Sequence, residues 1–299
     1  MRKFVIVAMV GASLGLSACG TTVKASLEQA VNSLGSTPSL QIHLTGSVTG
    51  TGMAQAEGIL KKVSIDMRYW NPSGAPLSQA GKNVNTEVVI NVAGSPVADI
   101  REVNTNDYVK LDLTHLTSIP GVNIPSSELS AIQLVVGGRW FELPKSLITS
   151  ALPKSSAATA TAKAQAAKDQ VIAKEVIAAL TKLIDSTKYT TLSNGAYAQT
   201  GTLNAVVKAL APTIKNVSPT TVIPTSTPGT YKLTLQRSGA TATGASITIT
   251  APNGAKGNAS VGFAATITHD NVTITAPKGA TVITPSLLKS LESGTSLAG

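Results

Sequence analysis

The chain has 299 residues, with 24 Lys and Arg against 15 Asp and Glu, and a formal net charge of +9 at pH 7. Only 3% of the residues are aromatic. The basic residues are scattered instead of interleaved with aromatic ones, which argues against nucleic acid as a partner. A single cysteine excludes a disulfide bond within the chain. The positive charge is explained by solubility or by attraction to anionic lipid headgroups.

The N-terminus has the pattern of a secretory signal peptide. Arg2 and Lys3 precede an apolar run from Phe4 to Leu16, and small residues follow. The apolar stretch is shorter than the roughly 20 residues that a membrane-spanning helix needs. The run Leu16-Ser17-Ala18-Cys19-Gly20 resembles the lipobox of bacterial lipoproteins. The resemblance implies cleavage before Cys19 and attachment of acyl chains such as palmitate to that cysteine.

We therefore expect residues 1–18 to be a lipoprotein signal peptide and residues 19–24 a lipidated tether. Two or three acyl chains, with each buried methylene contributing about 0.8 kcal/mol, would form a lasting anchor. The predicted location is the extracytoplasmic face of the cell membrane, where the chain is held through Cys19.

The next elements are a helix and then strands. Apolar residues recur at helical spacing from Val23 to Leu34, and Gly35 and Pro38 end this pattern. From Ser39 the period changes to two, as in strands with one apolar and one polar face. The residues that alternate in this way are Ile42, Leu44 and Val48; Ile59, Val63, Ile65, Met67 and Tyr69; Val88, Ile90 and Val92; and Val109, Leu111 and Leu113.

The middle of the chain is predicted to be mostly helical. A short helix is expected from Pro125 to Ile132, and the strand Arg139–Leu143 follows it. Residues 153–188 are rich in Ala, Thr and Lys and predict a long helix, whose second half is amphipathic. Another short helix is predicted from Gly201 to Leu210, before an extended Thr/Pro-rich connection.

The C-terminal third alternates again and predicts hairpins. Its apolar positions are Tyr231, Leu233 and Leu235; Ile247 and Ile249; Val261, Phe263, Ala265 and Ile267; and Val272 and Ile274. Turns are predicted at Ser238-Gly239, at Pro252-Asn253-Gly254 and at His269-Asp270-Asn271. The chain lacks the regular exchange of strand and helix that is typical of parallel sheets. The predicted class is therefore α+β, with a wide antiparallel sheet whose apolar face is covered by helices.

In this order of elements the chain resembles the actinobacterial lipoprotein carriers of the LppX and LprG type, which share the fold of the LolA and LolB chaperones. The local similarities are the lipobox, the strands Asp107–Leu111 and Arg139–Pro144, and the late hairpins. The resemblance implies a curved half-barrel, closed by helices over its concave face, that holds acyl chains. We expect one such domain over residues 25–299, with a helical insertion around 153–188. The Ala/Thr/Lys-rich stretch Ser155–Lys168 departs from the family.

The predicted function is to bind acyl chains of a lipid or glycolipid in an apolar cavity and to carry or present that lipid within the cell envelope. Acyl chains would leave water for the cavity without any bond chemistry. The ordinary alternative for each lining residue is packing in the core; Trp140 and Phe141 adjoin on a strand, so only one of them can face the core. The cavity candidates are Leu27, Val31, Ile65, Met67, Val109, Leu111, Trp140, Val176, Leu180, Leu183, Leu233 and Phe263.

The sequence contains no convincing catalytic or metal-binding pattern. Gly11-Ala12-Ser13-Leu14-Gly15 matches a hydrolase nucleophile motif, but it lies inside the predicted signal peptide. His43 and His269 are expected to be solvated, and Asp112 near His115 is too little for a catalytic pair. We therefore predict a protein that is not an enzyme and that has no cofactor and no metal.

The expected partners are a membrane, through the N-terminal lipid, a lipid or glycolipid ligand, and export or transport machinery. The chain is expected to be a monomer. The alternative function is that of a non-catalytic structural or interaction lipoprotein of the envelope, whose core is packed and binds no ligand.

Overall fold

The computed structural model describes residues 29–30, 32–81, 83–104, 106–119, 125, 133, 137–144, 175, 189–217, 220, 222–284 and 286. The chain divides into two compact units. The first unit comprises Met1–Ser36, Gly46–Ala54 and Thr161–Ile267, and the second comprises Thr37–Thr45, Gln55–Ala160 and Thr268–Gly299. The expected single domain over residues 25–299 stays a prediction, and its expected boundaries at residues 18 and 24 lie outside the described residues.

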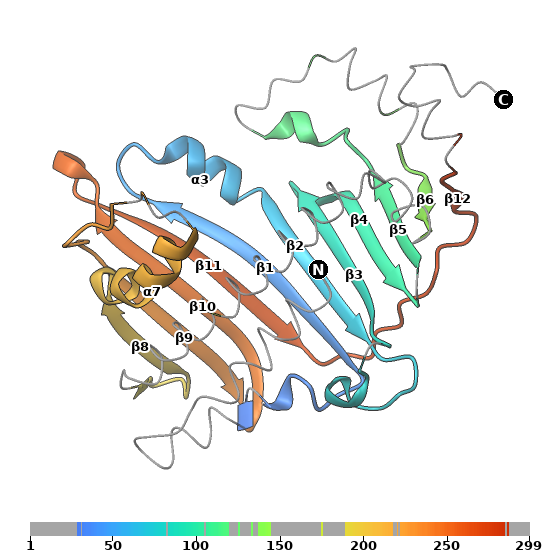
Figure 1. Ribbon diagram of the computed structural model, residues 1–299, viewed down its shortest axis with the longest axis horizontal. Helices are drawn as coiled ribbons and strands as arrows, with labels where there is room; N and C mark the ends of the chain where they lie inside the picture. Colours follow the sequence, from blue (N-terminus) through green and yellow to red (C-terminus); the bar gives the residue numbers. More distant parts are fainter. Residues whose placement is uncertain are drawn as a thin grey trace. The chain divides into compact units, whose positions relative to one another are not determined.

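The strands form a large open sheet, which confirms the α+β class in this coarse form. Their hydrogen-bonded order is β12-β6-β5-β4-β3-β2-β1-β11-β10-β9-β8-β7 (Figure 1). In the second unit, the neighbours from β1 to β6 are antiparallel, and β12 runs parallel to β6. In the first unit, the neighbours from β11 to β7 are antiparallel.

The second unit contains most of the strands that the first half of the chain forms. Strand β1 begins in this unit and ends in the first unit. The bounds are β1 Ser39–Thr49, β2 Val63–Trp70, β3 Asn85–Val92, β4 Ser95–Val103, β5 Asn106–Leu111, β6 Trp140–Leu143 and β12 Thr281–Val282, with helix α3 Ala54–Leu60 and the short 3-10 helices η1 Leu77–Gln79 and η2 Leu116–Ser118.

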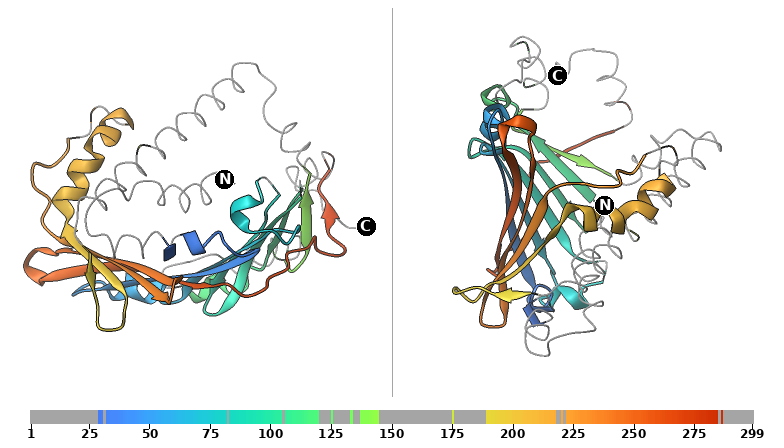
Figure 2. Two further views of the ribbon diagram at one scale, coloured as in Figure 1. Left: turned by 90° about the horizontal axis from the view of Figure 1, so that it is seen from below. Right: turned by 90° about the vertical axis from the view of Figure 1, so that its left-hand side faces the viewer.

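The first unit contains the late hairpins and one longer helix. Its elements are β7 Thr190–Thr191, β8 Tyr197–Thr202, α7 Leu203–Val217, β9 Thr230–Ser238, β10 Thr241–Pro252, η3 Gly254–Lys256 and β11 Asn258–Thr268. Helix α7 follows β8 directly, and Figure 2 shows it standing out to one side of strands β8 and β9. The Thr202 hydroxyl caps the helix by accepting a hydrogen bond from the backbone N–H of Ala205 at 3.2 Å.

Two hairpins connect neighbouring strands through tight turns. Strands β3 and β4 are joined through Ala93 and Gly94, whose φ angles are 51° and 82°. Two residues with positive φ match the twist of the adjoining strands. Gly239, with φ 58°, occupies the corresponding turn between β9 and β10. The predicted turn at Ser238-Gly239 is thus confirmed, and the turn between β3 and β4 lies at Ala93-Gly94, directly before Ser95 begins β4.

The segment 270–282 passes the first residues of β1 and β3 in the second unit instead of forming a hairpin. The Ser39 hydroxyl donates to the carbonyl of Asp270 at 2.7 Å, and the Asn85 amide donates to the carbonyl of Ile274 at 2.9 Å. Ile274 is buried in a cluster with Val103 and Tyr108. Farther on, β12 pairs with β6. This segment therefore contacts the first residues of β1 and β3 and then pairs alongside β6 at the edge of the sheet (Figure 1).

Four predicted elements were wrong in detail. Ile59 lies in helix α3 and not in the strand that contains Val63. Val272 and Ile274 belong to no strand, and His269 is not in a hairpin turn. The helix predicted from Gly201 begins at Leu203 and continues through Pro212. Apart from Glu175, which is helical, the helix predicted around residues 153–188 lies outside the described residues, as do most of the residues of the helices predicted before Gly35 and over 125–132.

Candidate functional site

The candidate site begins with an apolar face of the first unit. Leu233 on β9, Ile247 on β10 and Phe263 on β11 are direct cross-strand partners. Because side chains alternate along a strand, the residues two positions away lie on the same face. We call this set the first-unit apolar face; it consists of Tyr231, Leu233, Leu235, Ala245, Ile247, Ile249, Val261, Phe263 and Ala265.

This face is only partly buried. Phe263 exposes 53% and Val261 exposes 36% of its surface, whereas Tyr231 at the other side of the face exposes 5%. Leu233 and Ile247 are half-buried. Exposed large apolar side chains that lie beside each other are unusual on a soluble surface and often mark a binding site. Leu233 and Phe263, two of the predicted cavity residues, therefore lie on one accessible apolar surface.

A second apolar face lies in the second unit. Its central row runs across six strands, with Ile42, Met67, Val88, Ile100, Val109 and Phe141 as successive partners. The next row contains Leu44, Ile65, Ile90, Ala98 and Leu111. Ile100 is 41% exposed. Four predicted cavity residues thus share this second-unit apolar face, namely Ile65, Met67, Val109 and Leu111.

Trp140 lies on the opposite face of the second unit. It is the cross-strand partner of Lys110, and its neighbour Phe141 is the partner of Val109. The guanidinium carbon of Arg101 lies 4.5 Å from the centre of the Trp140 ring, a cation–π contact. The structure therefore separates Trp140 from the other candidates of this unit and puts Phe141, which was not among the candidates, beside them.

The face that carries Trp140 is charged and internally paired. The buried Glu87 carboxylate lies 2.7 Å from Arg68 and 2.7 Å from Arg101, and Arg101 also lies 3.2 Å from Asp99. Burial raises the pKa of Asp99 above its ordinary value, although the neighbouring Arg101 acts in the opposite direction. These charges neutralise one another, which indicates a structural network on this face.

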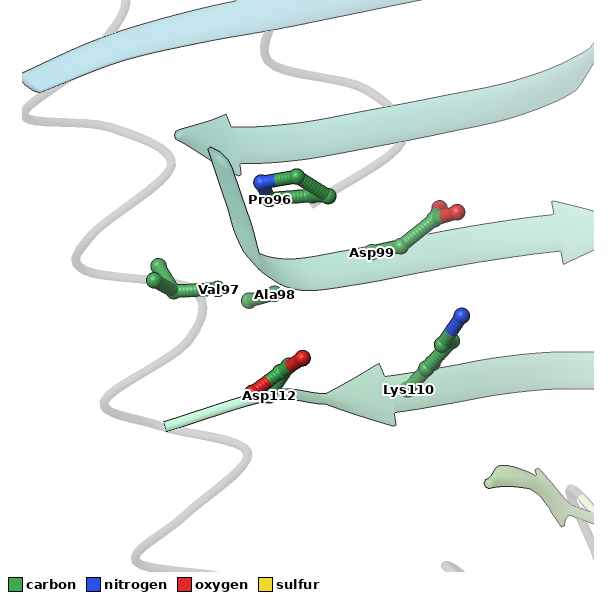
Figure 3. Close-up of a pocket in the computed structure, with 6 residues that line it drawn as sticks. All are labelled: Pro96, Val97, Ala98, Asp99, Lys110 and Asp112. Carbon is green, nitrogen blue, oxygen red and sulfur yellow. The ribbon is translucent and has the colours of Figure 1, made fainter. Parts of the chain in front are cut away.

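A small pocket opens beside this network, between the start of β4 and the end of β5. It is lined by Pro96, Val97, Ala98, Asp99, Lys110 and Asp112 (Figure 3). Its volume is about 70 Å³, well below the roughly 300–1,000 Å³ that is typical of ligand pockets. Hydrogen bonds from Thr114 hold the pKa of Asp112 below its ordinary value. This pocket is too small for an acyl chain.

The histidines make contacts that the sequence did not reveal. His43 Nδ1 lies 2.6 Å from Asp66, which also accepts a hydrogen bond from Asn91 at 2.6 Å. His269 Nδ1 lies 3.3 Å from the hydroxyl of Thr37. Within the described ranges, no group of three or more His, Cys, Asp or Glu residues could hold a metal ion.

Six of the thirteen predicted site residues cannot be located. Cys19, Leu27, Val31, Val176, Leu180 and Leu183 lie outside the described residues. In the part of the chain that the structure describes, no helix is long and apolar enough to cross a membrane. The predicted lipid-binding role of the described candidates stays a prediction.

Comparisons with known proteins give little further information. No protein family matches the chain, and no curated protein matches it. Among solved structures, the chain is similar to the lipoprotein LppX of Mycobacterium tuberculosis, with 12% identity over 84% of this chain and 97% of LppX and a TM-score of 0.33. A likeness at this level supports no conclusion about ligand or partner, so both must be inferred from the residues of this chain.

Proposed function

We propose that this protein is an exported envelope lipoprotein, anchored through Cys19, that binds acyl chains of a lipid or glycolipid on its apolar sheet surfaces. The observation that carries the proposal is the exposure of Phe263 in line with Leu233 and Ile247. Acyl chains lying on this row would remove its apolar surface from water, at about 25 cal/mol for each Å² covered.

The proposed mode of binding is passive. The headgroup stays in water while the hydrocarbon contacts the sheet, and helices close over a curved sheet as they do in the carrier family that the sequence resembles. Transfer from a bilayer to such a surface exchanges one apolar environment for another, so its free energy is close to zero. This balance permits both loading and release, which suits a carrier. No group that performs bond chemistry is part of the proposal.

A structural or interaction role in the envelope is the second candidate. The observation in its favour is the burial of Tyr231, which belongs to the first-unit apolar face but exposes only 5% of its surface. In this case the apolar faces would be covered by protein. The two candidates differ in one observable property, namely whether acyl lipid accompanies the purified protein.

The test uses the mature chain with Cys19→Ser, so that bound lipid cannot be confused with the anchor. The protein is expressed in a bacterial host, purified without detergent, extracted with organic solvent and analysed by mass spectrometry. We expect acyl lipid in a fixed ratio to protein. Reproducible absence of lipid, also after incubation with lipid vesicles, would favour the structural role. Palmitate labelling of the wild-type chain, but not of Cys19→Ser, tests the anchor separately.

A further inference from the structure

Charge is distributed unevenly along the chain. The segment 161–267 contains ten Lys and Arg against three Asp and Glu, whereas the rest of the chain contains fourteen against twelve. Among the described residues of the first unit, the single acidic side chain is Glu175, and it is bonded to Asn216 at 3.3 Å. The basic ones are Lys208, Lys215, Lys232, Arg237 and Lys256. The excess positive charge of the protein is thus concentrated in the first unit.

Helix α7 has two of these cations on one side. Lys208 and Lys215 are seven residues apart, nearly two full turns, so their side chains project in similar directions. Both are exposed, and α7 contains no acidic residue that could neutralise them. The apolar residues Leu203, Val207, Leu210 and Ile214 form a half-buried stripe on another side of the helix. Helix α7 is therefore an amphipathic helix whose own charged residues are all basic.

An apolar side chain is exposed just beyond this helix. Val222 lies five residues after the end of α7 and exposes 87% of its surface. Basic residues next to an exposed aliphatic residue are typical of surfaces that adsorb to anionic bilayers, where the cations contact headgroups and the aliphatic group enters the interface.

The proposed anchor keeps the first unit close to a membrane. Nine residues separate Cys19 from Gln29, where the described chain begins, so the ten Cα-to-Cα steps between them span at most about 36 Å even when fully extended. The described chain is then fixed to the first unit, because Ala30 is fully buried and the Ser33 hydroxyl accepts a hydrogen bond from the backbone N–H of Ala242 at 3.1 Å. Any membrane that holds Cys19 is therefore within reach of this unit.

We propose that the first unit docks on the surface of an anionic lipid bilayer through Lys208 and Lys215 of α7, with Val222 entering the interface. None of these three residues belongs to the first-unit apolar face that carries Phe263. The inference rests on the envelope location in the proposed function, but it does not require that acyl chains bind to the sheet. Docking would orient the first unit on the bilayer.

The test measures co-sedimentation of the mature Cys19→Ser chain with vesicles of phosphatidylcholine alone or with phosphatidylglycerol added. We expect binding only to the anionic vesicles and loss of binding at about 0.5 M salt, where charges are screened within a few Å. Because each lysine near such a surface contributes about a fivefold gain in affinity, Lys208→Gln with Lys215→Gln should weaken binding by about 25-fold.

The matched control is Lys61→Gln with Lys278→Gln, which removes the same charge from the second unit. Its affinity for anionic vesicles should be nearly that of the parent chain. Circular dichroism should show that both double variants are folded. Equal weakening in both double variants, or binding to neutral vesicles as strong as to anionic ones, would overturn the docking proposal. Extracted acyl lipid should be unchanged in Lys208→Gln with Lys215→Gln, so docking and lipid binding can fail independently.

Discussion

Substitution of Phe263 by Ser tests the proposed contact between acyl chains and the first-unit apolar face. Phe263 is the most exposed member of the row that it forms with Ile247 and Leu233. The substitution removes the ring but leaves the strand pairing of β11 with β10 unchanged. If hydrocarbon covers this row, affinity for acyl ligands must fall.

The size of the effect follows from the exposed area. A phenylalanine side chain has about 200 Å² of surface, so an exposed fraction of 53% leaves about 100 Å² to be covered. At about 25 cal/mol per Å², covering this area would contribute about 2.5 kcal/mol, or about 70-fold in affinity. This value is an upper limit, because a ligand that covers half of the ring would give about eightfold.

The assay is titration of the mature Cys19→Ser chain with a fluorescent fatty acid, followed by displacement with unlabelled lipid. Ala264→Ser is the control, since Ala264 is the next residue on β11, is also exposed, and lies on the opposite face. We expect a loss of about eightfold to 70-fold for Phe263→Ser and no loss for Ala264→Ser. Equal affinities of Phe263→Ser and the parent chain would refute the reasoning.

Three further predictions concern stability. Glu87→Gln should lower the free energy of unfolding by about 2 kcal/mol in urea denaturation, because it leaves two arginines without their buried carboxylate; an unchanged midpoint would contradict this. Tyr231→Phe should leave stability unchanged or raise it by up to about 1 kcal/mol, since the buried Tyr231 hydroxyl has no hydrogen-bond partner among the described residues. Because the pKa of Asp112 is lower in the folded protein than its ordinary value, the ionised carboxylate stabilises the fold at pH values above that ordinary pKa. This contribution is lost as the pH falls through the folded-state pKa. Thermal melts should therefore show a smaller loss on acidification for Asp112→Asn than for the parent chain, and identical pH profiles would exclude the effect.

The sequence predicted which residues of one strand share a face of the sheet. It predicted less reliably which of the two faces of the sheet that is. Ile65 and Met67 lie on one side of β2, as their spacing required, because alternation along a strand is a local property. The choice between Trp140 and Phe141 depended on the pairing of β6 with β5 and on the position of Arg101, which is distant in the sequence. Such long-range pairing leaves no periodic signal.

The C-terminal segment shows a second limit of pattern analysis. Val272 and Ile274 alternate with polar residues as in a strand, but the segment is an extended connection with one side turned to a core. Extended chain that packs on one side has the same period of two, whether or not it hydrogen-bonds to a neighbour. The burial of Glu87 was also missed, because its two arginine partners come from neighbouring strands.

Photo-crosslinking tests the central claim most directly. A fatty acid with a diazirine near the end of its chain would be bound to the Cys19→Ser protein, irradiated, and located by peptide mass spectrometry. We expect labels on apolar-face residues of β9, β10 and β11, including Phe263, and competition by unlabelled lipid. Labels confined to other surfaces, or labels that excess lipid does not displace, would contradict acyl-chain binding at this site.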